Sequence, residues 1–175
     1  MKGMLLFTAA AIAVTGAADY ETTDEMIMSG IASQYGRGRM MSNIRVRQAG
    51  RTAYDLPTPV PQADVYFATI DCSDIGTWFK IRRAGEDETG QPYAWETAYA
   101  ADCAGLSDGG LGFMLFNRPV PMSRYQANIW LERVRQGEYQ PVYVAEVDYE
   151  TAVRWDTVGR GQPVELVKLH PEGVE

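Results

Sequence analysis

An acidic residue and a cysteine stand side by side at the end of an apolar segment, in the stretch AYAADCAG at 98–105. A carboxyl group donates a proton near neutral pH only when burial raises its pKa, and the small apolar neighbours of Asp102 permit such burial. We therefore take Asp102 as the candidate catalytic residue. Two other interpretations stay open: Asp102 contacts a ligand without chemistry, or its carboxylate only accepts hydrogen bonds from backbone amides of the turn.

Cysteine and histidine, the residue types that most often bind metals or act as nucleophile and base, are scarce in this chain. Cys72 and Cys103 are the only cysteines, and His170 is the only histidine. In an oxidising compartment the two cysteines are expected to form a disulfide, whereas in a reducing one they would be separate buried thiols. This set is too small for a structural zinc site, so we expect no metal and no cofactor. A cysteine–histidine nucleophile pair is not expected either, because His170 lies in the C-terminal tail.

The N-terminus indicates the compartment. One lysine precedes an apolar run at 4–14, and small residues follow up to Ala18. This layout is typical of a secretory signal peptide, with cleavage predicted after Ala17 or Ala18. We expect a signal peptide at 1–18 and an acidic linker at 19–29; the alternative is an uncleaved anchor or a buried N-terminal helix. The mature protein is then secreted, periplasmic or on the cell surface, and not held in the membrane.

Length and charge narrow the class of protein. The chain has 175 residues, which suits one domain. Its 16 basic and 23 acidic residues give a formal charge of −7. No net positive field is present to attract phosphate, so nucleic-acid binding is not expected. Adsorption to anionic wall polymers or anionic lipid by charge alone is not expected either, on the same ground.

Short strands are expected to position Asp102. Runs of β-forming or alternating residues predict strands at 30–36, 44–48, 63–71, 76–85, 93–102, 141–147 and 158–169. The two strands on either side of the turn DETGQP should form a hairpin, and the proline-rich 56–62 should be a loop. This composition is mainly β and favours a barrel.

Two helices are predicted among these strands. One covers 122–137, with Ser123 at its start and with Tyr125, Ile129 and Trp130 as a buried face. The other is short and follows Asp148, whose carboxylate suits an N-cap. The arginines 45, 47 and 51 lie near the predicted strand at 44–48, and we interpret them as a solvated strand face rather than an anion site.

Four motifs, taken in order, resemble a known family. GIASQYG (30–36) resembles an opening G-x-A-S-x-Y-G, and DIGTWFKI (74–81) resembles a PFGTxVRV strand. AADCAG (100–105) falls where that family carries xxDRGP, and 145–169 resembles its closing segment. The chain is in these respects similar to rare-lipoprotein-A-like domains. The resemblance implies a six-stranded double-psi β-barrel with short helices over 30–169, related to expansins and barwin-like proteins, and a tail at 170–175.

The resemblance also implies a function. These families bind or cut cell-wall glycans, and some rare-lipoprotein-A members are lytic transglycosylases of peptidoglycan. Asp102 corresponds to their catalytic or glycan-contacting aspartate. Hydrolysis typically needs a second carboxylate. A transglycosylase can use one acid, because the sugar's own hydroxyl closes on the anomeric carbon, so a lone Asp102 fits transglycosylation better.

The chain departs from the family in two places. The family's histidine after the opening motif is absent, and a helical insertion at 106–140 follows the Asp102 turn. We expect the insertion to form one wall of a glycan groove, with Tyr35, Trp95 and Trp130 contacting sugar rings; aromatics on strands are otherwise core residues. The alternative function is a non-catalytic glycan-binding or structural surface barrel that uses the insertion as a protein interface.

Overall fold

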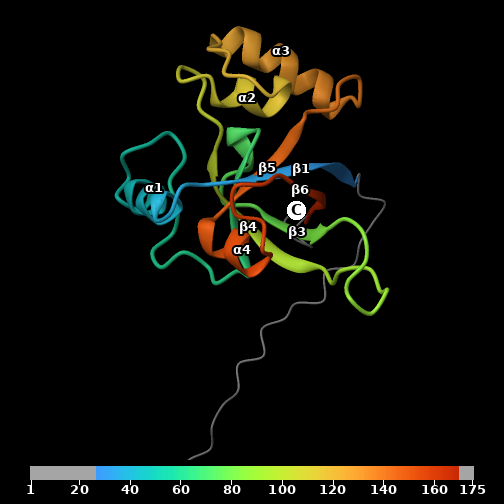
Figure 1. Ribbon diagram of the computed structural model, residues 1–175. Coiled ribbons are helices and arrows are strands. Elements are labelled where there is room, and N and C mark those ends of the chain that lie inside the picture. The colour runs from blue at the N-terminus through green and yellow to red at the C-terminus, as the bar shows by residue number, and fades with distance from the viewer. Residues whose placement is uncertain (1–26, 170–175) are drawn as a thin grey trace, which may run out of the picture.

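The computed structural model describes residues 27–169; the predicted signal peptide, most of the linker and His170 lie outside this range. Six strands close into a barrel in the order β1-β5-β2-β4-β3-β6 (Figure 1). They are β1 (Met28–Gln34), β2 (Val65–Thr69), β3 (Trp78–Arg83), β4 (Glu96–Cys103), β5 (Tyr143–Val147) and β6 (Gln162–Lys168). The mainly β barrel is confirmed, and its first strand begins inside the segment expected to be linker.

The barrel mixes parallel and antiparallel neighbours. β1–β5 and β2–β4 are parallel, and the other four pairs are antiparallel. β3 and β4 form the predicted hairpin, with Trp78 opposite Tyr99. Neither parallel pair joins strands that are consecutive in the chain, because a parallel connection needs a long crossover. α1 and the insertion both lie in the chain between β1 and β5, and η1 and β3 lie between β2 and β4.

The barrel interior is a closed apolar core. Alternate residues of each strand point into it, as the period of two along a strand requires. Phe67 and Phe79 meet edge to face there, with ring centroids 5.1 Å apart. Neighbouring side chains that share this core include Val65, Ile81, Ala100, Val144, Val147, Val164 and Leu166. Polar side chains are therefore left to the outer face and the ends.

The segment expected as a strand at 44–48 is instead part of a helix, α1 (Arg39–Gln48). Met40 and Ile44, one helical turn apart, are buried against the outer wall of the barrel. The alternation of Ile44 and Val46 was too short to distinguish the two periods. Val46 is exposed, which corrects the strand prediction.

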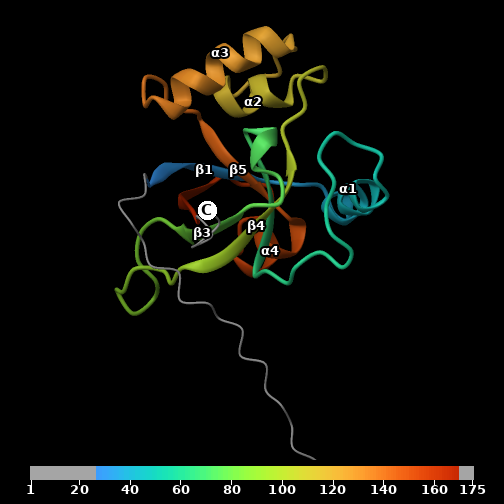
Figure 2. The same ribbon diagram turned by 180° about the vertical axis from the view of Figure 1, so that it is seen from behind.

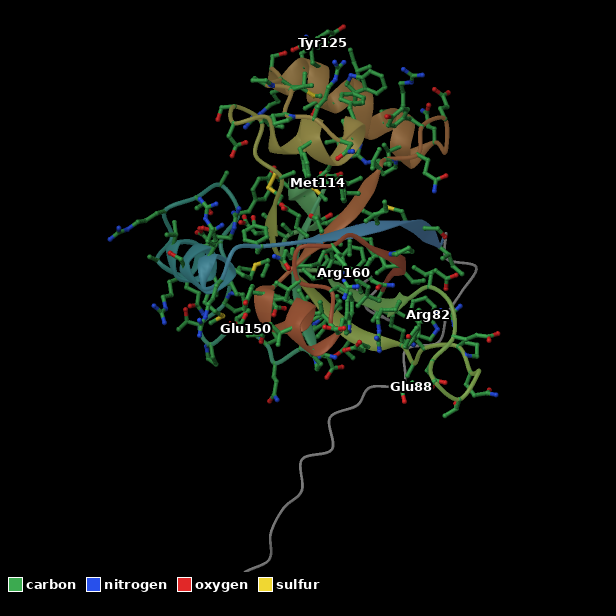
Figure 3. The ribbon with its side chains drawn as sticks, viewed as in Figure 1. Arg82, Glu88, Met114, Tyr125, Glu150 and Arg160 are labelled. Carbon is green, nitrogen blue, oxygen red and sulfur yellow. A yellow bond between two sulfur atoms is a disulfide. The ribbon has the colours of Figure 1, made fainter. Side chains whose placement is uncertain are left out.

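The insertion forms a helix pair, α2 (Gly110–Phe116) and α3 (Arg124–Arg135), beside one end of the barrel (Figures 1 and 2). The start of α3 is confirmed, because Ser123 and Gln126 form a capping box. Its predicted buried face is wrong for Tyr125 and Ile129, while Trp130 is partly buried against the insertion. Ala127, Leu131 and Val134 are buried, whereas Ile129 is exposed and Tyr125 is 75% exposed (Figure 3).

The part of the chain that the structure describes contains four α-helices and one 3-10 turn, whereas the sequence predicted two helices. α2 was not predicted, because glycines are poor helix formers. One of them, Gly112, is required by packing, since a Cβ there would lie 2.6 Å from the backbone nitrogen of Val120. The helix after Asp148 is confirmed as α4 (Tyr149–Arg154), with Asp148 accepting from the Thr151 amide at 2.8 Å. A single 3-10 turn, η1 (Cys72–Asp74), follows β2.

The predicted disulfide is present. Cys72 in η1 is bonded to Cys103 at the end of β4, across 31 positions of sequence. It ties the turn after β2 to the residue that follows Asp102. None of the helices within 27–169 is long and apolar enough to cross a membrane.

Removal of this disulfide should lower stability. For Cys72→Ser with Cys103→Ser we expect a free energy of unfolding about 3–4 kcal/mol lower, because the unfolded chain is no longer constrained by the loop. Urea unfolding followed by tryptophan fluorescence measures the difference. Wild-type protein in reductant should behave like the double variant, and a change below about 1 kcal/mol would contradict this account.

Candidate functional site

A bulge in β4 aims Asp102 at the outer face of the barrel. Phe67 pairs with Ala100, but the next residue, Ala68, pairs with Asp102, so Ala101 is the extra residue. Such a bulge turns the following side chain to the other face of the sheet. Asp102 therefore leaves the barrel core and lies under α1, only 5% exposed.

Three side chains surround the Asp102 carboxylate. One oxygen accepts from the Tyr35 hydroxyl at 2.7 Å and from Asn43 Nδ2 at 2.5 Å. The other accepts from Arg47 Nε at 3.1 Å and from Arg47 Nη2. A carboxylate offers about four acceptor positions, and all are taken here. The partners are side chains, not the backbone amides of a turn.

α1 and the end of β1 supply these partners. Asn43 and Arg47 are one turn apart on α1, on the face that meets the barrel. Arg47 also donates to the Tyr54 carbonyl at 3.2 Å, which fastens the loop after the helix. Tyr35 follows β1, and its amide donates to the Val147 carbonyl at 2.8 Å. The site thus joins β1, α1, β4 and β5.

Tyr35 is held as a proton donor. Burial raises its pKa far above the usual range, and the negative charge of Asp102 and its hydrogen bond add to the effect. The charge of Glu146 acts in the same direction, which places this second carboxyl near Tyr35. The hydroxyl therefore stays protonated and donates to Asp102.

Glu146 and Asp102 belong to one row across the outer wall. Ser33 on β1 pairs with Glu146 on β5, Glu146 pairs with Ala68 on β2, and Ala68 pairs with Asp102. Ala145 and Val147, on either side of Glu146, point into the barrel core, so Glu146 faces outward. The two acidic residues are two strands apart, about 10 Å between Cα atoms. The buried Ala68 lies between them in the row.

Glu146 differs from Asp102 in exposure and in ion pairing. It is partly exposed, and no ion pair among the described residues includes it. Burial raises its pKa, and the negative charges of Asp102 and Asp108 raise it further; the Ser33 hydroxyl and Arg39 oppose this shift without reversing it. Of two neighbouring carboxyls, Asp102 is paired with a cation and Glu146 favours the protonated form.

Of the sequence-predicted site residues, the structure brings together Tyr35 and Asp102 alone. Trp95 precedes β4, at the opposite end of the strand from Asp102, and Arg82 stacks on it at 4.4 Å. Trp130 packs against Phe116 at 4.9 Å inside the insertion. Neither tryptophan lies in the row that contains the two carboxyls.

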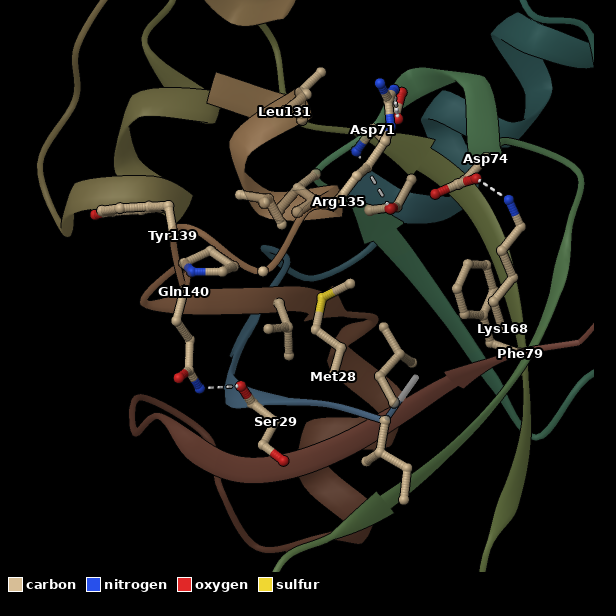
Figure 4. Close-up of a pocket in the computed structure, with 18 of the residues that line it drawn as sticks. Met28, Ser29, Asp71, Asp74, Phe79, Leu131, Arg135, Tyr139, Gln140 and Lys168 are labelled. Atoms are coloured by element: carbon tan, nitrogen blue, oxygen red, sulfur yellow. Dashed lines mark hydrogen bonds and ion pairs between the residues drawn. The ribbon is translucent and has the colours of Figure 1, made fainter. Parts of the chain in front are cut away.

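The insertion lines a cleft of about 980 Å³, but Asp102 is not in its wall (Figure 4). Leu131 and Val134 of α3 face barrel residues such as Val144 across it. Its charged groups are already paired: Asp71 with Arg135, and Asp74 with Lys168 at 2.5 Å. The insertion therefore lines a cleft that does not contain Asp102 or Glu146, and the charged groups in this cleft are paired with each other.

Arg45 and Arg47, two arginines of the predicted cluster, point to different sides of α1. Arg47 points inward to Asp102, whereas Arg45 is exposed on the far side of the helix. These residues are on a helix and not on the strand face that we predicted. Within residues 27–169, no group of three or more histidine, cysteine, aspartate or glutamate side chains is placed to bind a metal ion.

The sequence did not reveal Asn43, Arg47 or Glu146 as site residues. The spacing of Asn43 and Arg47 was the available signal, once α1 is known to be a helix. For Glu146 the signal was one charged residue inside an apolar strand, PVYVAEV. A scan against protein-family models, a search of curated proteins and a search of solved structures found nothing that matches this chain.

Arg47 balances a buried charge, and its removal should be costly. The Arg47 side chain is 12% exposed and that of Asp102 6%. We expect Arg47→Met to lower the free energy of unfolding by about 3–5 kcal/mol, because Asp102 loses its counter-ion. Arg47→Met with Asp102→Leu should cost less than Arg47→Met alone. Urea unfolding tests this, with the exposed Arg45→Met as control; additive single effects would contradict it.

Glu146 should make stability depend on pH. Its native pKa lies above the ordinary value of 4.5, so between these two values the folded state binds more protons than the unfolded state. The wild-type free energy of unfolding therefore falls as pH rises through this window. Glu146→Gln has no such loss, so it should gain stability relative to wild type with rising pH. Urea unfolding at several pH values measures this, and a difference independent of pH would contradict the raised pKa.

Proposed function

We propose that the protein is an exported, cell-wall glycan-active barrel of the rare-lipoprotein-A type, with double-psi topology and peptidoglycan as its substrate class. The closed mixed six-stranded barrel supports this proposal. The four resembling motifs fall on β1, on β3, at the end of β4 and on β5 to β6. The disulfide between Cys72 and Cys103 is the kind of bond that persists in exported proteins.

The pair of unlike carboxyls carries the proposal. Asp102 is paired with a cation, while burial raises the pKa of Glu146 on the same row. Cleavage of a glycosidic bond needs a proton donor at the leaving oxygen, and a carboxyl whose pKa is raised by burial suits that role. Glu146 is also partly exposed on the outer face of the barrel, where a ligand can reach it.

Asp102 acts in this proposal by holding its neighbours. Its lone pairs are filled by Tyr35, Asn43 and Arg47, so it fixes the Tyr35 hydroxyl and the position of α1 beside Glu146. The reaction is lytic transglycosylation, in which the sugar's own hydroxyl displaces the leaving group. That reaction needs one acid and no water nucleophile.

A second candidate function rests on a different observation. Full occupation of the Asp102 carboxylate also suits a non-catalytic glycan-binding or surface barrel in which Asp102 is structural. The insertion would then be a protein interface, and Tyr125 and Ile129, one turn apart on α3, are exposed apolar residues on it. This function predicts glycan or partner binding without bond cleavage.

Digestion of purified peptidoglycan decides between the two. We expect the mature protein to release anhydro sugars, read by mass spectrometry, and Asp102→Asn to release about 100-fold less or none, because Tyr35 and Arg47 lose their anchor. Circular dichroism must show that the variant is folded. Absence of products from both proteins would remove cleavage, and co-sedimentation with peptidoglycan would then support the binding function.

A further inference from the structure

The Ser33 hydroxyl and the Glu146 carboxyl are neighbours on the outer wall. The two residues are paired in register, and the Ser33 hydroxyl acts on the pKa of Glu146. The Ser33 Oγ atom is itself buried, whereas Glu146 is partly exposed. Glu146 joins no ion pair within residues 27–169. Glu146 is therefore the member of this pair that a ligand can reach.

Asp102 is not placed to donate a proton to a ligand. Its four acceptor positions are occupied by Tyr35, Asn43 and Arg47, and it lies almost entirely out of water in an ion pair with Arg47. To donate a proton, Asp102 would first have to break its contact with Arg47. Glu146, by contrast, is partly exposed and has its carboxyl free.

We infer that Glu146, and not Asp102, is the catalytic proton donor, with Asp102 as a positioning residue for Tyr35 and α1. The assignment rests on the proposed function. It is carried by the row Ser33, Glu146, Ala68 and Asp102, in which Glu146 is the partly exposed carboxyl, whereas Asp102 and the Ala68 between them are buried.

The proton transfer can be written without an external reactant. The protonated Glu146 carboxyl gives its proton to the glycosidic oxygen, the bond from the anomeric carbon to that oxygen breaks, and the electron pair stays on the leaving oxygen as a hydroxyl. The sugar's own hydroxyl oxygen then bonds to the anomeric carbon. Its proton passes to the Glu146 carboxylate, which regenerates the acid. One glycosidic bond is exchanged for an intramolecular one.

The charges around Glu146 come from several elements. Asp102 on β4 and Asp108 before α2 favour its protonated form, and Arg39 at the start of α1 opposes them. Ser33 on β1 and Tyr35 after it are the neutral neighbours. Activity should accordingly be lost as pH rises and Glu146 ionises. In Asp102→Asn this loss should move to lower pH, because one of the negative charges is gone.

The test compares Glu146→Gln, Glu146→Asp and the control Glu150→Gln, which changes an exposed glutamate of α4 away from the row (Figure 3). Release of anhydro sugars is measured against pH. We expect Glu146→Gln to lose about 100-fold or more, Glu146→Asp to retain part of the activity, and Glu150→Gln to match wild type. Carboxyl-carbon NMR of the wild type should show Glu146 titrating above Glu150, and this readout does not depend on turnover.

The outcomes separate the two proposals. If wild type is active and Glu146→Gln is equally active, the assignment of Glu146 fails while the proposed function stands. Persistence of the wild-type pH profile in Glu146→Gln, or an NMR midpoint no higher than that of Glu150, also overturns it. A wild type that releases no products overturns the proposed function, and the catalytic assignment falls with it.

Discussion

A buried carboxylate that must keep its charge balanced organises this molecule. Asp102 lies almost entirely out of water, so its charge is tolerated only where cationic and hydrogen-bonding groups surround it. Arg47 and Asn43 meet that need from α1, and Tyr35 meets it from the end of β1. The position of Tyr35 therefore depends on this group, and so does the docking of α1, together with the burial of Met40 and Ile44 against the barrel. The adjacent disulfide at Cys103 fixes the strand end that carries it.

The end of β4 also explains why Asp102 and Glu146, which differ in exposure and in ion pairing, lie close together. The β4 bulge places Asp102 on the outer face, and the plain alternation of β5 places Glu146 there. Their common neighbour is Ala68, which pairs with both. Of the two, Asp102 alone forms an ion pair within residues 27–169, and burial together with the negative charge of Asp102 raises the pKa of Glu146. A closed barrel makes this possible, since β4 and β5 are far apart in the sequence and both flank β2.

Local signals predicted much of the fold, and their failures have physical causes. The hairpin of β3 and β4, the capping box at Ser123 and the cap at Asp148 all depend on a few neighbouring residues, and each is confirmed. α1 was taken for a strand because a five-residue alternation fits either period. On α3, Tyr125 and Ile129 were expected in the core, but the helix packs through another face. Which face is buried depends on a partner that the sequence does not place.

The sequence by itself determined the mainly β class, the pairing of the only two cysteines and the choice of Asp102 as a site residue. It did so because these follow from local residue types and from elimination. The tertiary structure alone decided which groups surround Asp102 and that Glu146 stands across Ala68 from it. Those contacts join segments tens of residues apart, through strand order, one bulge and the docking of α1. These segments come together only when the barrel closes, so no local sequence pattern predicts their contacts.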